Sequence, residues 1–131
     1  MFYGYAESES LQNPLILNDY IPVKIVIEHV PTSQNHPYVH AYYFQFKEDE
    51  ILDEVEKFSR ETLPRWYQLF WSEKVVYAVF KDKYFKLDNE KEWKSEEYKK
   101  VQQYGVDHGI GLVYMDFNKN LARFAETLAK K

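Results

Sequence analysis

Three histidines lie in or beside one predicted β-hairpin. His29 is near the end of KIVIEHV (24–30), while His36 and His40 flank the start of YVHAYYFQF (38–46). Imidazole nitrogens bind zinc and serve as general bases near neutral pH. If the apolar residues of the two segments pair on one side, His29 lies opposite His40, beside the loop that contains His36. This spacing predicts a metal or catalytic site at the hairpin rim, although a hydrogen-bonded rim position is the simpler interpretation of His40.

Other signatures of catalysis are absent from the sequence. It contains no cysteine, which excludes disulfides, thiolate nucleophiles and cysteine zinc sites. It also lacks the GxSxG, GxxxxGK[ST], GxGxxG and HExxH motifs. The glycines of GVDHGIG (105–111) follow a predicted helix, whereas a phosphate loop precedes one. We therefore expect no cofactor and favour a protein that is not an enzyme.

Charge and hydropathy narrow the range of partners. A formal net charge of −4 disfavours nucleic-acid binding, which depends on neutralising phosphates. No apolar run approaches the ~18 residues of a membrane span. The start, MFYGYAESES, lacks the basic and apolar regions of a signal peptide. We expect no nucleic-acid partner, no membrane association and a cytoplasmic location.

Length and composition predict one domain over residues 1–131. The sequence is 45% hydrophobic and 29% charged, with four Gly and five Pro, which is typical of a folded globular chain. No repeat or linker divides it. Residues 1–20 show no steady period and include a turn at Asn13-Pro14, so we expect an irregular N-terminal segment.

The remaining sequence predicts an N-terminal hairpin, a three-stranded meander and three helices. Strands are expected at 24–30, 38–46, 66–71, 75–80 and 84–87, and helices at 47–64, 95–109 and 118–130. Ser95 is the expected N-cap of the second helix and Gly109 its C′ residue. The segment 111–117 is expected to be a short strand or an extended return. The predicted fold class is α+β, with a mostly antiparallel sheet of five or six strands packed by about three helices.

The meander segment RWYQLFWSEKVVYAVFKDKYFKL (65–87) is apolar at most positions. A half-buried strand needs apolar residues at only every second position. If Trp71 pairs with Val75, Phe70 and Phe80 fall on one face of the meander. The second face then carries mainly Tyr and Trp, and its candidate binding residues are Tyr67, Leu69, Trp71, Tyr77 and Tyr84.

Both faces of this meander need cover. Three helices can cover one face, and we do not expect them to cover both in a two-layer domain. The second face is left for the N-terminal residues, the hairpin, a second copy of the chain or a ligand. Because Tyr and Trp are favoured at recognition surfaces, we favour a non-enzymatic interaction module that self-associates or binds a protein partner. The alternative is a small enzyme or metal-binding protein that uses His29, His36 and His40.

Several motifs occur in an order that resembles a family of small uncharacterised prokaryotic proteins. They are WYQLFW, VVYAVFKDKYFKL, a downstream Trp93, YGVDHGI and MDF. The likeness covers residues 51–117. It implies the meander and the helix that follows, and it implies no activity. The hairpin histidines lie outside it, so it implies no site residue.

Overall fold

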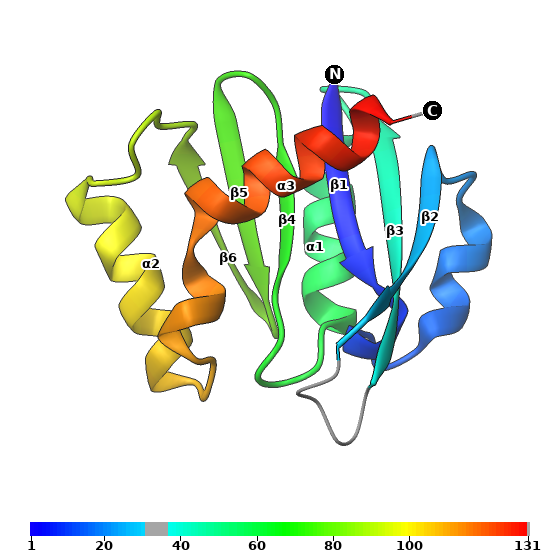
Figure 1. The fold of residues 1–131 in the computed structure, drawn as a ribbon, viewed down its shortest axis with the longest axis horizontal. Coiled ribbons are helices and arrows are strands. Elements are labelled where there is room, and N and C mark those ends of the chain that lie inside the picture. The colour runs from blue at the N-terminus through cyan, green and yellow to red at the C-terminus, as the bar shows by residue number, and fades with distance from the viewer. Residues whose placement is uncertain (31–36, 131) are drawn as a thin grey trace.

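The computed structural model describes residues 1–30 and 37–130. This part of the chain forms one antiparallel sheet of six strands with three α-helices packed on it (Figure 1), which confirms the predicted α+β class. The strands are β1 (Phe2–Glu7), β2 (Lys24–His29), β3 (Tyr38–Phe46), β4 (Gln68–Trp71), β5 (Val75–Phe80) and β6 (Lys83–Asp88). The helices are α1 (Ile51–Glu61), α2 (Glu96–Asp107) and α3 (Phe117–Ala129), with short 3-10 helices η1 (Ser8–Ser10), η2 (Pro14–Asp19) and η3 (Leu112–Met115). None of these described helices is long and apolar enough to cross a membrane.

The strand β1 lies in the middle of the sheet, which corrects the expectation of an irregular segment over residues 1–20. The strand order is β2-β3-β1-β4-β5-β6. Because both faces of β1 are covered, its sequence FYGYAE is apolar at consecutive positions and shows no alternation. Gly4 permits close packing at this point, since a Cβ there would lie 2.6 Å from a ring carbon of Phe70 and 2.9 Å from one of Phe46.

Capping residues set the helix ends, largely as the sequence predicts. The Ser95 hydroxyl accepts a hydrogen bond of 3.1 Å from the Tyr98 backbone N–H at the start of α2. Gly109 follows α2 with a φ of +89°, a left-handed conformation that favours glycine. The expected strand or extended return over 111–117 is wrong: it forms η3 and the start of α3. Asp116 caps α3 by accepting a hydrogen bond of 3.0 Å from the Lys119 N–H.

Helices cover both faces of the sheet, so the two-layer expectation is wrong. In Figure 1, α1 lies behind the sheet and α3 crosses in front of it. On the α1 side, Val55 and Phe58 form a core with Phe70. On the α3 side, η3 and α3 supply Met115 and Phe124 to a second core, which α2 completes near β6. A helix that crosses the strands covers more of them than a helix aligned with them, which is why three helices suffice.

Candidate functional site

The turn between β4 and β5 sets a meander register different from the expected one. Trp71 pairs with Val76, whereas the expected partner was Val75. Ser72 and Val75 continue the observed register up to a tight turn at Glu73 and Lys74: the Ser72 backbone N–H donates to the Val75 carbonyl at 2.8 Å, and the Ser72 hydroxyl accepts from the Val75 N–H at 3.2 Å. A slip of one residue moves each side chain of a strand to the opposite face relative to its neighbour. The predicted aromatic-face residues are therefore divided between the two faces of the sheet.

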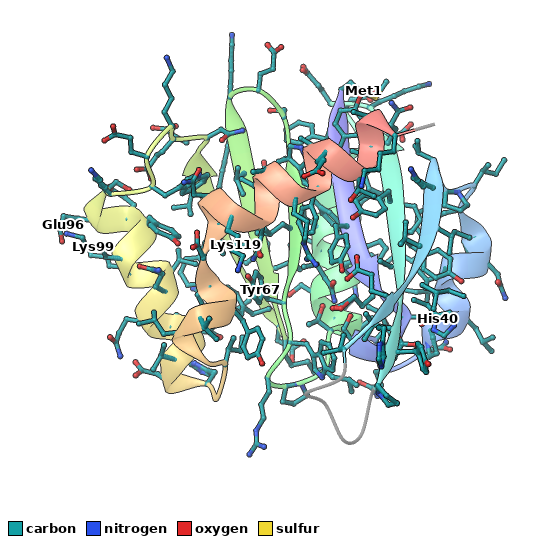
Figure 2. The ribbon with its side chains drawn as sticks, in the orientation of Figure 1. Met1, His40, Tyr67, Glu96, Lys99 and Lys119 are labelled. Carbon is teal, nitrogen blue, oxygen red and sulfur yellow. The ribbon has the colours of Figure 1, made fainter. Side chains whose placement is uncertain are left out.

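Tyr67, Leu69 and Trp71 lie on the α3 side. The Trp71 ring stacks 5.4 Å from that of Phe124 in α3. The Tyr67 hydroxyl donates to a carbonyl of η3 and accepts a hydrogen bond of 2.9 Å from the Asn120 amide. Burial raises the pKa of this hydroxyl. These side chains thus hold η3 and α3 against the sheet, and Figure 2 shows Tyr67 near the middle of the molecule.

Tyr77 and Tyr84 belong to the α1 side. Tyr77 is only 6% exposed and contacts the rings of Phe2 and Tyr84, at 5.9 and 6.2 Å between centroids. The structure therefore does not bring the five predicted residues together as one surface.

The hairpin register is shifted by two residues from the expected one, which keeps each side chain on its predicted face. His29 pairs with Tyr38 and stacks on it at 4.9 Å, while His40 pairs with Ile27. Both histidines are exposed on the same side of the hairpin. His36 lies outside the described residues. Within residues 1–30 and 37–130, no group of three His, Asp or Glu side chains could hold a metal ion.

A carboxylate that the sequence analysis does not single out fixes His40. Glu9, in η1, accepts a hydrogen bond of 2.6 Å from the His40 backbone N–H and lies 2.8 Å from the imidazole Nδ1 through its other oxygen. Burial opposes ionisation of Glu9, but hydrogen bonds from His40 and Ser8 outweigh burial and lower its pKa. Figure 2 places His40 near the β2 end of the sheet. The pair orients the ring as a carboxylate orients a catalytic or metal-binding imidazole.

A second carboxylate, Glu7, is largely buried at the end of β1 on the α3 side. Its Oε2 atom has no hydrogen-bond partner in the described part of the chain. Burial raises its pKa from 4.5 to about 7; Glu28 adds to this increase, and Arg123 opposes it. Arg123 donates a hydrogen bond of 3.2 Å to Glu28. Glu7 can therefore exchange a proton near neutral pH. Once residues 2–7 are recognised as a strand, the two-residue spacing of Tyr3, Tyr5 and Glu7 places Glu7 on this face.

The least covered apolar side chains of the sheet lie on and just before β2. Ile25 is 50% exposed, Ile27 64% and Val23 50%, and the neighbouring Tyr38 on β3 is 56% exposed. We refer to Val23, Ile25 and Ile27 as the aliphatic row. Ile25 and Ile27 share a side of the hairpin with Phe44, but the α1-side core reaches Phe44 and leaves the row open. The alternation in the sequence predicts that these side chains share a side, and it carries no signal that this side remains uncovered.

The described part of the chain contains clefts away from these groups. One of about 710 Å³ lies at the sheet end lined by Tyr3, Trp71 and Lys74, and another of about 290 Å³ lies between α1 and Asp82. Neither is lined by the two carboxylates described above or by His40. Substrates are usually enclosed in a concave site with a few convergent polar groups. Glu7, Glu9 and His40 therefore do not lie in an enclosed substrate site formed by either cleft.

Comparison with known proteins adds no relative to this picture. No protein-family model matches the chain, and neither the curated proteins nor the solved structures give a match. Function must therefore follow from the chemistry and exposure of the residues themselves.

Proposed function

We propose that this protein is a non-enzymatic interaction module that binds a protein partner through β2 and the aliphatic row. The observation that carries the proposal is a strand edge that pairs with no other described strand, combined with half-exposed aliphatic side chains. β2 is the terminal strand of the sheet, and Ile25 and Ile27 are at least half exposed. Folded proteins usually protect edge strands with charge, proline or a covering element.

The chemistry of β2 fits an extended polypeptide partner. A strand that adds to a sheet edge forms main-chain hydrogen bonds with it, and alternate side chains supply specificity. On β2 the open side carries Ile25 and Ile27, followed by His29, while Lys24 and Glu28 lie on the other side and provide one charge of each sign. A partner with alternating aliphatic and charged residues would match both sides. The absence of cysteine from the sequence agrees with a reducing compartment such as the cytoplasm.

The alternative, a small enzyme or metal-binding protein at the hairpin rim, has one observation in its favour, the hydrogen bonds between Glu9 and His40. These bonds also have a structural role, because the hydrogen bond from the His40 main-chain N–H to Glu9 anchors β3 to η1. Metal analysis of protein purified without a polyhistidine tag separates the two roles. Bound zinc that is lost in His40→Ala would favour the metal site over an interaction module.

Photocrosslinking tests the interaction module directly. A photoreactive amino acid replaces Ile27 in one variant and Leu15, an aliphatic residue of η2 that is 69% exposed, in a matched control. Each variant is irradiated both as purified protein and in an extract of the source cells. We expect a discrete adduct from position 27 that is absent from position 15.

A competition step makes the result specific to the aliphatic row. An excess of unlabelled wild-type protein should abolish the adduct, and the same excess of Ile25→Lys should not. If position 27 gives no discrete adduct in either sample, or if both proteins compete equally, the aliphatic row is not a binding surface.

A further inference from the structure

We propose that the partner of β2 is β2 of a second copy of this chain, paired antiparallel about a two-fold axis beside Val26. Two six-stranded sheets would then form one continuous sheet. This inference rests on the proposed function, because it names the partner of the same strand. It is carried by the hydrogen-bonding pattern of β2, by its charge pattern and by its contrast with the other edge of the sheet.

The hydrogen-bonding groups of β2 alternate between β3 and the open edge. The Val30 N–H donates to the Pro37 carbonyl at 2.6 Å, in the same register as the β2–β3 ladder. In an antiparallel ladder, hydrogen-bonded pairs recur at every second residue. Lys24, Val26 and Glu28 therefore direct their main-chain groups toward β3. Ile25 and Ile27 direct theirs toward the edge, where another strand can accept and donate.

The order of side chains along β2 is complementary to itself in one register. When Val26 lies opposite the partner's Val26, Ile25 lies opposite the partner's Ile27, and both present outward hydrogen-bonding groups. Lys24 then lies opposite the partner's Glu28, and the same pair recurs on the other side of the axis. Opposite charges directly across two strands are favourable, and like charges are unfavourable. Moving the axis to Ile25 or Ile27 loses both charge pairs.

Contacts within the chain hold these two charges at the edge. Lys24 donates a hydrogen bond of 2.8 Å to the Thr127 carbonyl near the end of α3. Glu28 accepts one of 3.2 Å from Arg123. Both side chains lie on the α3 side, as Val26 does, so the charge pairs and the aliphatic row would occupy opposite faces of the joined sheet. The α3 face of the interface would therefore carry the two charge pairs on either side of the central Val26 residues, and the other face the aliphatic row.

The opposite edge of the sheet, β6, explains why association through β2 would stop at a dimer. The strand β6 carries Lys83, Lys86 and Asp88 as exposed side chains. Lysines on an edge strand oppose edge-to-edge association. A pair of chains joined at β2 would end in two lysine-bearing edges, and a closed two-fold dimer results instead of a filament.

Sedimentation analysis of the full chain over a concentration series tests the association. We expect wild-type protein to dimerise and Ile27→Lys to remain monomeric, with Leu15→Lys as the matched control that dimerises as wild type does. Thermal denaturation of each variant would verify that it is folded. A folded wild-type chain that stays monomeric throughout overturns the proposal. If the photoreactive residue at position 27 still captures a discrete protein, the proposed function stands and only the identity of the partner changes.

Charge exchange tests the register. Lys24→Glu places two like-charge pairs in the dimer, as does Glu28→Lys, and each should weaken self-association about tenfold. An equimolar mixture of the two variants restores both opposite-charge pairs and should recover the wild-type affinity. A mixture that associates no better than either variant alone overturns the pairing about Val26.

A cysteine offers a second test of the same register. Across the axis the two Val26 residues form a non-hydrogen-bonded pair, for which the Cα separation is about 4.5 Å, within the range that a disulfide spans. Since the chain has no cysteine, Val26→Cys should give a covalent dimer under mild oxidation, whereas Leu15→Cys should not. Equal disulfide formation in both variants would contradict the proposed axis.

Discussion

The two edges of the sheet meet solvent in opposite ways. At one edge, β6 exposes lysines and lies close to α2, whose Tyr104 packs 5.1 Å from the Phe85 ring. At the other edge, β2 exposes Ile25 and Ile27. The same sheet therefore protects one edge by charge and by a helix, and it protects the aliphatic side of the other edge by neither. The difference supports the proposal that the β2 edge binds a partner, because an uncovered edge strand presents main-chain groups with which another strand can pair.

The cores at the β6 end and the β2 end of the sheet also differ in charge. Near β6 the core is a neutral aromatic cluster in which Phe80 contacts Phe85 and Tyr104 at 5.9 and 4.9 Å. Near β2 the α3 side contains Glu7, with a pKa raised to about 7, close to Glu28. The core at the β6 end is therefore built from neutral side chains, while part of the β2 end responds to pH.

The largest expected effect is at the β6 end. Leu87→Ala should lower the free energy of unfolding by about 3 kcal/mol, because it opens a cavity in a buried cluster. Ile27→Ala, at the exposed edge, should cost far less in the monomer. Urea denaturation of both variants measures the difference, and equal losses would show that the two edges are packed alike.

The next effect is the pH dependence of the β2 end. The raised pKa means that folded Glu7 holds its proton more tightly than unfolded Glu7. Protonated Glu7 therefore contributes fully to the free energy of unfolding below pH 4.5, and this contribution is lost as pH rises through about 7. Between pH 5 and pH 8 the loss is on the order of 2 kcal/mol. Glu7→Gln should remove this slope, and denaturation of both proteins at the two pH values measures it. Identical slopes would show that Glu7 has an ordinary pKa.

A smaller effect is expected at the N-terminus of α2, the helix beside β6. Ser95→Ala removes the hydroxyl that accepts from the Tyr98 N–H and should cost about 1 kcal/mol. Ser95→Thr retains a hydroxyl that can accept from the Tyr98 N–H and donate to Glu90, and it serves as the matched control. Thermal denaturation compares the two, and a loss of equal size in both would mean that the cap contributes little.

The smallest effect on monomer stability is expected at the aliphatic row. Ile27→Thr keeps a β-branched side chain on the strand, and an exposed substitution of this kind should change the free energy of unfolding by less than about 0.5 kcal/mol. Its effect should appear in association instead, as weaker dimerisation in sedimentation. A large loss of monomer stability would place Ile27 in the core and remove the contrast between the edges.

The sequence predicted the elements whose patterns are local. Alternation marked the hairpin strands, and Ser95 and Gly109 marked the ends of α2. It failed for β1, because a strand buried on both faces has no alternation. It also failed for the β4–β5 register, since the choice between a shorter and a longer turn depends on where the Ser72 hydroxyl bonds.

The candidate site was predictable only in part. The sequence placed His29 and His40 on one side of the hairpin, and the structure agrees. It could not place Glu9 beside His40, because that contact joins segments distant in the chain. It also could not show the aliphatic row to be open, because burial depends on where α1 and η2 pack and not on the strand itself.

The central position of β1 also affects how the chain can fold as it is synthesised. β1 precedes both of its neighbours, since β3 begins at Tyr38 and β4 at Gln68. During synthesis the β2–β3 hairpin and the β4–β6 meander each form from adjacent segments, while β1 cannot complete its contacts until β4 has been made. In the order of the chain, the sheet is therefore two parts with local connections, joined by a strand that is made first and inserted between them. A short peptide with the sequence of β1, added to a chain that lacks it, would be the natural basis for a split-protein reporter.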